Sequence, residues 1–216
     1  ASEHDVMVVL RELDYDSDPM AWRGGDRKEL ARLLRERTKP IIVVANKADI
    51  APEENIERLE TAADRVVPCS AESELALRRA VEAGVADYDP GDERFTITGE
   101  ISDTQRSGLE QIRTVLEAHG GTGVQAALDE AVYDLLDRIT AYPVQNETHW
   151  TDGQGNVLPD AVLLASGATP KDLAFAVHSD IGEGYLHAVD AREDRRISED
   201  HELAEGDVTK IVSTAN

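Results

Sequence analysis

The chain has 216 residues, of which 41% are hydrophobic, and its 44 acidic and 22 basic residues give a formal net charge of −22. This length suffices for one or two domains with buried cores, of which we expect two, and the apolar content excludes a disordered chain. A single cysteine excludes internal disulfides, and the sequence shows no signal peptide and no run of about eighteen apolar residues, so we expect a cytoplasmic protein without a membrane span.

The charge is distributed unusually, because only five of the 22 basic residues are lysines. An acid-rich, lysine-poor surface is typical of proteins adapted to molar salt, in which a short screening length weakens the repulsion between like charges. The alternative is an acidic surface that avoids nucleic acid at ordinary salt. We favour the halophilic interpretation.

Residues 1–39 are expected to form two helical pieces, with breaks near residues 16–19 and at the Gly24-Gly25 pair. Asp26 is suited to cap the second piece. The apolar stripe of that piece consists of Leu30, Leu33 and Leu34.

A short β-branched run over residues 40–44 predicts a buried, parallel strand. It leads into Asn46, Lys47 and Asp49, which form the pattern Asn-Lys-x-Asp that reads guanine in GTPases. The Asp49 carboxylate can accept from guanine N1–H and from the N2 amine side by side, whereas adenine presents an acceptor there. We expect Lys47 to lie along the base or ribose, and Asn46 to tie neighbouring loops together and touch the base.

Residues 65–69 predict a second strand, which ends in Ser70, Ala71 and Glu72. Ser-Ala at a strand end is the fifth GTPase motif, whose backbone N–H groups bind guanine O6. Two strand-end motifs in this order and at this spacing predict a base-binding site with the members Asn46, Lys47, Asp49, Ser70, Ala71 and Glu72. The alternative is two ordinary strand ends with polar tips.

A GTPase also needs a Gly-rich phosphate loop and an Asp-x-x-Gly metal switch, and neither occurs in the 45 residues before Asn46. The Arg23-Gly24-Gly25 turn has no following Gly-Lys-Ser/Thr and cannot replace the phosphate loop. We therefore predict no catalytic residue and no metal ligand in this chain, which looks like the C-terminal part of a GTPase and is expected to be inactive alone.

Four further helices are expected, starting near residue 52, at Ser73, after the cap Ser102, and from Thr122 to Ile139. In the GTPase pattern a closing helix follows the Ser-Ala loop at once. Here the helix after Thr122 is taken as that closing helix, displaced by an insertion over residues 72–121. Residues 1–139 are thus predicted to be a partial GTPase domain.

Residues 140–216 change to short strands and turns and are predicted to be a second domain. The expected strands cover residues 141–144, 157–164, 185–189 and 207–212, and a helix begins at Thr169-Pro170. Strand–strand–helix–strand–strand is the order of the β-grasp, or ubiquitin-like, fold. The predicted fold class is α/β, with the C-terminal part of a P-loop GTPase domain, a helical insertion and a β-grasp domain.

Several segments resemble the YchF group of Obg-like GTPases, in its archaeal and haloarchaeal form, with a C-terminal TGS domain. The segments that carry the resemblance are residues 39–49, 70–78, 120–125, 155–160, 169–174, 178–182 and 206–212. They span nearly the whole chain.

The resemblance implies a nucleoside triphosphatase that acts with ribosomes in translation and uses Mg²⁺. Relatives that depart from the full base-reading motif favour ATP, whereas Asn46, Lys47 and Asp49 favour GTP here. The implied partners are a guanine nucleotide, the ribosome or rRNA through the TGS domain, and the N-terminal half of the GTPase domain. The alternative is a non-enzymatic TGS module that docks to ribosome or RNA.

Other reactive residues have simpler explanations. His178, His187 and His201 lack metal-ligand spacing. Cys69 is expected to be a small buried residue, since no histidine is placed to activate it. A basic cluster, consisting of Arg192, Arg195 and Arg196, could contact rRNA or a partner, and a solvated hairpin among acidic residues explains it equally well.

Overall fold

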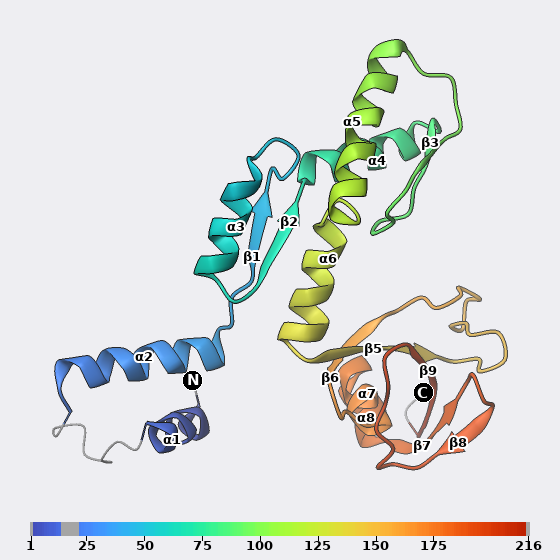
Figure 1. The fold of residues 1–216 in the computed structure, drawn as a ribbon. Helices are drawn as coiled ribbons and strands as arrows, with labels where there is room; N and C mark the ends of the chain where they lie inside the picture. The colour runs from blue at the N-terminus through green and yellow to red at the C-terminus, as the bar shows by residue number, and fades with distance from the viewer. Residues whose placement is uncertain (1, 14–21, 215–216) are drawn as a thin grey trace. The chain divides into compact units, whose positions relative to one another are not determined.

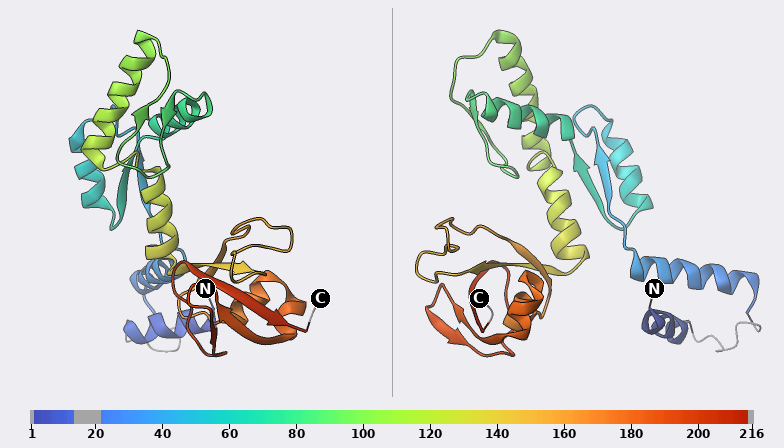
Figure 2. Two further views of the ribbon diagram at one scale, coloured as in Figure 1. Left: turned by 90° about the vertical axis from the view of Figure 1, so that its right-hand side faces the viewer. Right: turned by 180° about the vertical axis from the view of Figure 1, so that it is seen from behind.

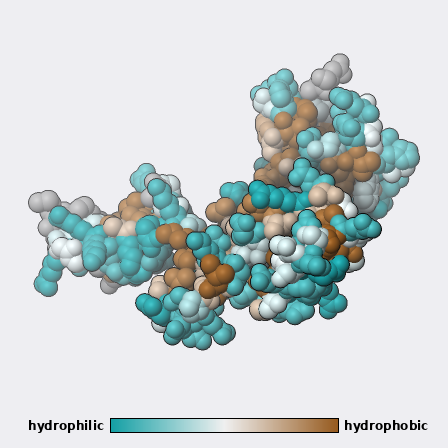
Figure 3. All heavy atoms as spheres, turned by 90° about the horizontal axis from the view of Figure 1, so that it is seen from above, coloured by the Kyte–Doolittle hydropathy of each residue, from teal (hydrophilic) through white to brown (hydrophobic). Residues whose placement is uncertain are grey.

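The computed structural model describes residues 2–13 and 22–214, and the chain divides into two compact units, Ala1–Leu128 and Asp129–Asn216. Both units combine helices and strands, which confirms the expected mixed α/β class (Figure 1). In the view of Figure 3 most of the surface is hydrophilic, and smaller hydrophobic patches lie among the hydrophilic residues. No helix in the described ranges is both long enough and apolar enough to cross a membrane.

Helices α1 (Glu3–Glu12) and α2 (Gly24–Thr38) form the two expected helical pieces. The Gly24-Gly25 pair was expected to break the helix, but it forms the first turn of α2. The helix start is fixed at Arg23, whose N–H donates to the Asp26 carboxylate at 2.7 Å and whose carbonyl accepts the Asp26 N–H at 3.1 Å. The break expected at residues 16–19 lies outside the described residues.

Strands β1 (Val43–Asn46) and β2 (Val66–Cys69) pair in parallel, as expected, and α3 (Glu53–Ala62) connects them and contacts both. The prediction of a buried strand is wrong for most of β1, in which Ala45 is buried but Val44 is 42% exposed. Parallel strands are buried when neighbours cover them, and within the described residues β1 pairs with β2 alone.

Helix α4 (Ala71–Glu82), the short strands β3 (Ala86–Asp87) and β4 (Thr96–Ile97), and α5 (Asp103–His119) form the segment that the sequence predicts to be a helical insertion. α4 begins two residues earlier than expected because Ser70, not a later residue, caps it. Ser102 caps α5 as predicted. One core cluster joins the insertion and consists of Leu77, Tyr88, Phe95, Leu109, Ile112 and Leu116.

Helix α6 (Val124–Asp129) continues as a π-helical segment (Glu130–Leu135), and β5 (Arg138–Val144) follows. The helix was expected to reach Ile139, but this residue lies in β5, opposite Leu164. Its apolar side chain packs on the sheet core, which explains why a helical pattern seemed to continue. The domain boundary after Ile139 stays a prediction.

The second unit has a five-stranded sheet in the order β6-β5-β9-β7-β8. The further strands are β6 (Val162–Ala165), β7 (Tyr185–Asp190), β8 (Arg195–Ile197) and β9 (Asp207–Ser213). β5 and β9 run parallel in its middle and the other pairs are antiparallel. Helix α7 (Pro170–Val177) contacts four of the five strands, and the short α8 (Ser179–Glu183) follows it (Figure 2). This arrangement is the expected β-grasp.

Candidate functional site

The two sequence motifs lie side by side, because they follow the carboxyl ends of neighbouring parallel strands. Asn46 at the end of β1 stands opposite Cys69 at the end of β2. The ladder continues into the first motif, since the Ala48 N–H donates to the Cys69 carbonyl at 2.9 Å. The edge of a parallel sheet at its carboxyl ends is where open α/β sheets bind ligands.

Asn46 ties the two motif loops together, as the sequence predicted. Its Oδ1 accepts the Lys47 N–H at 2.8 Å and, from the other loop, the Ala71 N–H at 3.2 Å. The contact between Asn46 and a base stays a prediction.

The turn after β1 projects Asp49 into solvent. Lys47 has a φ of 71°, in the left-handed region, and its carbonyl accepts the N–H groups of Ile50 and Ala51 at 3.1 and 2.9 Å. Asp49 is exposed, and across the described part of the chain its carboxylate has no hydrogen-bond or ion-pair partner. A carboxylate that is held in a tight turn with both oxygens free is ready to accept from a ligand.

In the first turn of α4, three backbone N–H groups have hydrogen-bond acceptors within the protein, and one N–H has none in the part of the chain that the structure describes. Ser70 caps the helix, with its Oγ accepting the Ser73 N–H at 3.3 Å and its carbonyl accepting the Glu74 N–H at 3.1 Å. The Ala71 N–H is bound to Asn46. Among the described residues, the N–H of Glu72 finds no acceptor, and it points from the positive end of a helix.

Ser70 itself faces inward, unlike the exposed Asp49. It is 1% exposed, and its N–H donates to the Thr122 carbonyl at 2.8 Å. The sequence predicted that the Ser70 and Ala71 N–H groups bind guanine O6. In the structure both N–H groups instead donate to acceptors of the protein, the Thr122 carbonyl and Asn46 Oδ1.

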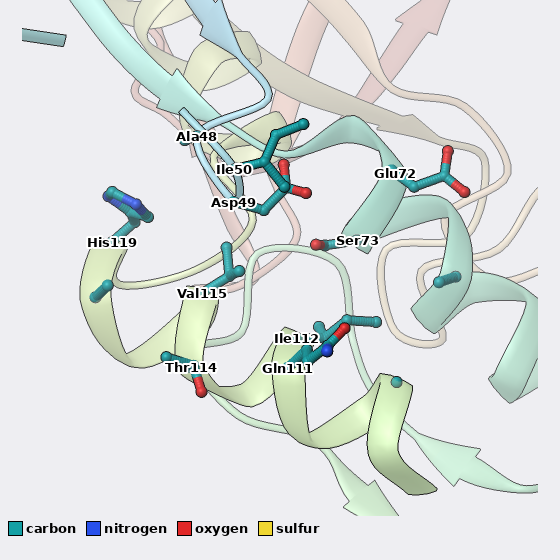
Figure 4. Close-up of a pocket in the computed structure, with 13 residues that line it drawn as sticks. Ala48, Asp49, Ile50, Glu72, Ser73, Gln111, Ile112, Thr114, Val115 and His119 are labelled. Carbon is teal, nitrogen blue, oxygen red and sulfur yellow. The ribbon is translucent and has the colours of Figure 1, made fainter. Parts of the chain in front are cut away.

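A pocket of about 620 Å³ opens beside these loops. Asp49 and Glu72 line one side of it, and α5 supplies Gln111, Thr114 and His119 from the other (Figure 4). No motif in the sequence marks the α5 residues. They reach the pocket only through the packing of α5 on α4, which local patterns do not specify.

A glycine-rich turn, residues 120–123, fixes the end of β2. Gly120 ends α5 in the left-handed conformation, and Gly123 has a φ of 79°. A Cβ on Gly123 would collide with the Pro68 carbonyl oxygen. The backbone of the turn therefore lies directly on β2, a contact that only glycine permits at this position.

Glu74 is the one acid buried beside the site among the described residues, at 5% exposure. Burial raises the pKa of its carboxyl, but hydrogen bonds from Thr122, Tyr88 and Arg78 outweigh burial and hold that pKa below its ordinary value. The carboxylate therefore stays ionised. Cys69 is itself only 4% exposed, and its own burial, together with the nearby charge of Glu74, raises the pKa of its thiol.

The remaining candidates are a metal centre and the basic cluster. In residues 2–13 and 22–214, no group of three or more His, Cys, Asp or Glu side chains is placed to hold a metal ion. Within these ranges, no such cluster is placed for the Mg²⁺ that the resemblance implies. Of the basic cluster, Arg192 lies 5.2 Å from the Trp150 ring and donates to the Gly206 carbonyl, and Arg195 pairs with Glu193.

Comparison with known families gives two matches. The family described as Obg-like GTPase YGR210-like, G4 motif-containing domain, matches residues 44–146, and the TGS domain family matches residues 154–213. The first match contains both motif loops and the insertion, and the second covers most of the β-grasp unit.

Known proteins are similar along the chain. A GTP-binding protein of Methanocaldococcus jannaschii is 42% identical over 99% of this chain and 54% of its own length. A GTP-binding protein of Schizosaccharomyces pombe is 28% identical over 74% of this chain and 42% of its own length. The crystal structure of a GTP-binding protein from Pyrococcus horikoshii has 38% identity and a TM-score of 0.71, covering 99% of this chain and 57% of that one. The chain spans about half the length of the curated relatives it matches.

Proposed function

Because the chain belongs to the Obg-like GTP-binding family, with a G4 motif-containing domain followed by a TGS domain, we propose that its first unit recognises the guanine base of a nucleotide. The matched family is the YGR210-like group, and the narrower placement in the YchF group stays a prediction.

One observation carries the proposal: the site offers a free acceptor and a free donor in the two segments that follow the adjacent strands β1 and β2. The acceptor is the Asp49 carboxylate and the donor is the Glu72 N–H. Guanine presents the complementary pair, with N1–H and the N2 amine to donate and O6 to accept. Asp49 would bind the first two and Glu72 the third, while Asn46 holds the two loops at a fixed separation.

Adenine presents the opposite pattern at the same positions, since its N1 accepts and its N6 amine donates. Binding adenine would place two acceptors together at Asp49 and two donors together at Glu72. Polar groups that a bound base covers and leaves without partners reject such analogues strongly. This geometry supports GTP rather than ATP as the nucleotide.

The activity of the longer protein is a separate part of the proposal. We propose a GTPase in which Mg²⁺ and the phosphate loop belong to the N-terminal half of the domain, and this chain alone hydrolyses no nucleotide. Contact with the ribosome or rRNA through the TGS domain, a cytoplasmic location and adaptation to molar salt complete the proposal. The sequence resemblance and the composition support these three points.

Titration of the 216-residue chain with GMP and AMP, followed by NMR chemical shifts, tests base recognition. Only base contacts are available to offset an association cost of at least about 4 kcal/mol, so we expect a millimolar dissociation constant for GMP and weaker binding of AMP. Shifts should concentrate at residues 46–49 and 70–73. Equal affinity for the two nucleotides would favour the alternative, a TGS module without a nucleotide role. Phosphate release from GTP above background would show that catalytic groups were missed.

A further inference from the structure

Glu74 makes none of the proposed contacts with guanine, yet its side chain is fully engaged. Oε1 accepts from Arg78 Nε at 2.6 Å, and Oε2 accepts from the Tyr88 hydroxyl at 2.8 Å and the Thr122 hydroxyl at 2.7 Å. Burying a carboxylate costs free energy, which these bonds must offset. The bonds also reach two segments outside the helix, so the side chain can position the first turn of α4 as well as stabilise the fold.

The bonds of Glu74 join the first turn of α4 to the glycine-rich turn. Thr122 is linked to α4 twice: its hydroxyl donates to the Glu74 side chain, and its carbonyl accepts the Ser70 N–H. Tyr88 adds a third link from the loop after β3. The free Glu72 N–H belongs to the same helical turn, between the two anchored residues.

The loop of Asp49 is held by different bonds. It depends on the turn at Lys47 and on the Ala48 N–H, which donates to the Cys69 carbonyl. The hydrogen-bond partners of Glu74 are Arg78, Tyr88 and Thr122, none of which belongs to that loop. Removing the Glu74 side chain therefore deletes no bond within the Asp49 loop, and the Asn46 link between the two loops also stays in place.

We propose that Glu74 is a positioning residue that aims the Glu72 N–H at guanine O6, an inference that rests on the proposed base recognition. Without the Glu74 carboxylate, α4 keeps its Ser70 cap and the bond from the Ser70 N–H to the Thr122 carbonyl, but its first turn loses the links from Glu74 to the Thr122 and Tyr88 hydroxyls. A hydrogen bond weakens steeply as its angle departs from linear, so contact with O6 is lost first. Recognition of the N1 and N2 edge by Asp49 remains.

Three nucleotides that differ at single positions test this role. GMP is the reference; 6-thioguanosine 5′-monophosphate replaces O6 by a poorer sulfur acceptor, and inosine 5′-monophosphate lacks the N2 amine. NMR titration of the 216-residue chain gives the dissociation constant for each. In the wild type we expect each analogue to bind at least about threefold more weakly than GMP.

The variants are Glu74→Leu, which removes both carboxylate oxygens, and Thr122→Val, which removes one donor to them at similar volume. Glu82→Leu, on an exposed position of the same helix, is the matched control. In the first two variants the preference for GMP over the 6-thio analogue should fall toward one, and the preference for GMP over the inosine analogue should stay as in the wild type. The control should keep both preferences.

An unchanged preference against the 6-thio analogue overturns the inference, and guanine recognition then stands without it. Equal loss of both preferences also overturns it, because Glu74 would then act on the whole fold. If Glu74→Leu does not fold, the same two preferences, for GMP over the 6-thio analogue and for GMP over the inosine analogue, are measured in Thr122→Val and decide the question. A wild type that does not distinguish GMP from either analogue refutes the proposed function, and the inference falls with it.

Discussion

Asn46 Oδ1 accepts a hydrogen bond from the Ala71 N–H at 3.2 Å, across 25 residues of sequence. One side-chain oxygen thereby couples the two loops from which the free acceptor and the free donor project. The spacing between Asp49 and Glu72 depends on this bond, because the strands themselves end before either residue.

Asn46→Ala should weaken binding of GMP by roughly fivefold, which corresponds to about 1 kcal/mol for one hydrogen bond. The Ala71 N–H would lose its acceptor, and the two loops would be joined only less directly, by the bond from the Ala48 N–H to the Cys69 carbonyl. NMR titration with GMP measures the change. Asn55→Ala, at an exposed position of α3, is the control and should bind as the wild type does. If both variants bind GMP equally, the bond to Ala71 does not organise the site.

Gly123→Ala should destabilise the first unit by about 1–3 kcal/mol, the usual range for overpacking a tight contact. The added Cβ would collide with the Pro68 carbonyl, so the glycine-rich turn must move away from β2. Thermal unfolding measures the effect.

Gly84→Ala is its matched control, with a φ of 70° and no atom within 4 Å of the added Cβ. Both substitutions carry the cost of a left-handed alanine, and only the first adds a collision. Similar losses in melting temperature for the two variants would mean that the turn adapts to the extra atom.

The local parts of this site could be predicted from the sequence, and the parts built by packing could not. The tie from Asn46 and the parallel strand pair followed from motifs at strand ends. The α5 side of the pocket, the inward position of Ser70 and the partners of Glu74 depend on how the insertion folds back, and no local pattern encodes that. Base recognition by the residues so placed stays a prediction.

The fold shows the same division. Capping residues Ser102 and Thr169 marked two helix starts correctly, because each cap acts within one turn. Strands β3, β4 and β8 were missed, since each is only two or three residues long. The apolar spacing that extended a helix to Ile139 was misleading, because that side chain packs on a sheet.

Glu74 should make folding stability depend on pH in the acidic range. Burial raises the pKa of the Glu74 carboxyl, but its hydrogen bonds lower that pKa by more than burial raises it. The folded-state pKa therefore lies below the ordinary value of 4.5. A depressed pKa contributes stability that is present above pH 4.5 and is lost as the pH falls through the folded-state value. Glu74→Gln should remove this contribution.

Urea unfolding at a series of pH values from neutral to acidic measures the contribution of Glu74 to stability. The free energy of unfolding of Glu74→Gln should lie below that of the wild type at neutral pH, and the gap should narrow under acidic conditions. Glu82→Gln serves as the control. A gap that stays constant across the range would mean that ionisation of Glu74 does not stabilise the fold.

Salt should stabilise the chain if its charge of −22 is an adaptation to molar salt. The Debye length shortens from about 10 Å at 0.1 M to about 3 Å at 1 M, which weakens the repulsion among exposed carboxylates. We therefore expect the melting temperature to rise steeply between low and molar KCl. A melting temperature that is indifferent to KCl would instead indicate an ordinary acidic surface.

Asp49→Asn should exchange guanine for xanthine as the preferred base. An amide in place of the carboxylate brings a donor to the site, where guanine also presents its N2 amine, whereas xanthine presents a carbonyl at that position. Loss of a charge-assisted hydrogen bond, worth about 1.5–3 kcal/mol, should weaken GMP binding by at least about tenfold. NMR titration with GMP and xanthosine 5′-monophosphate measures the exchange, and Asp64→Asn, an exposed residue before β2, controls for the change in charge. A variant that still prefers GMP would show that Asp49 does not read the N1 and N2 edge, and the acceptor in the site would then have to be sought elsewhere.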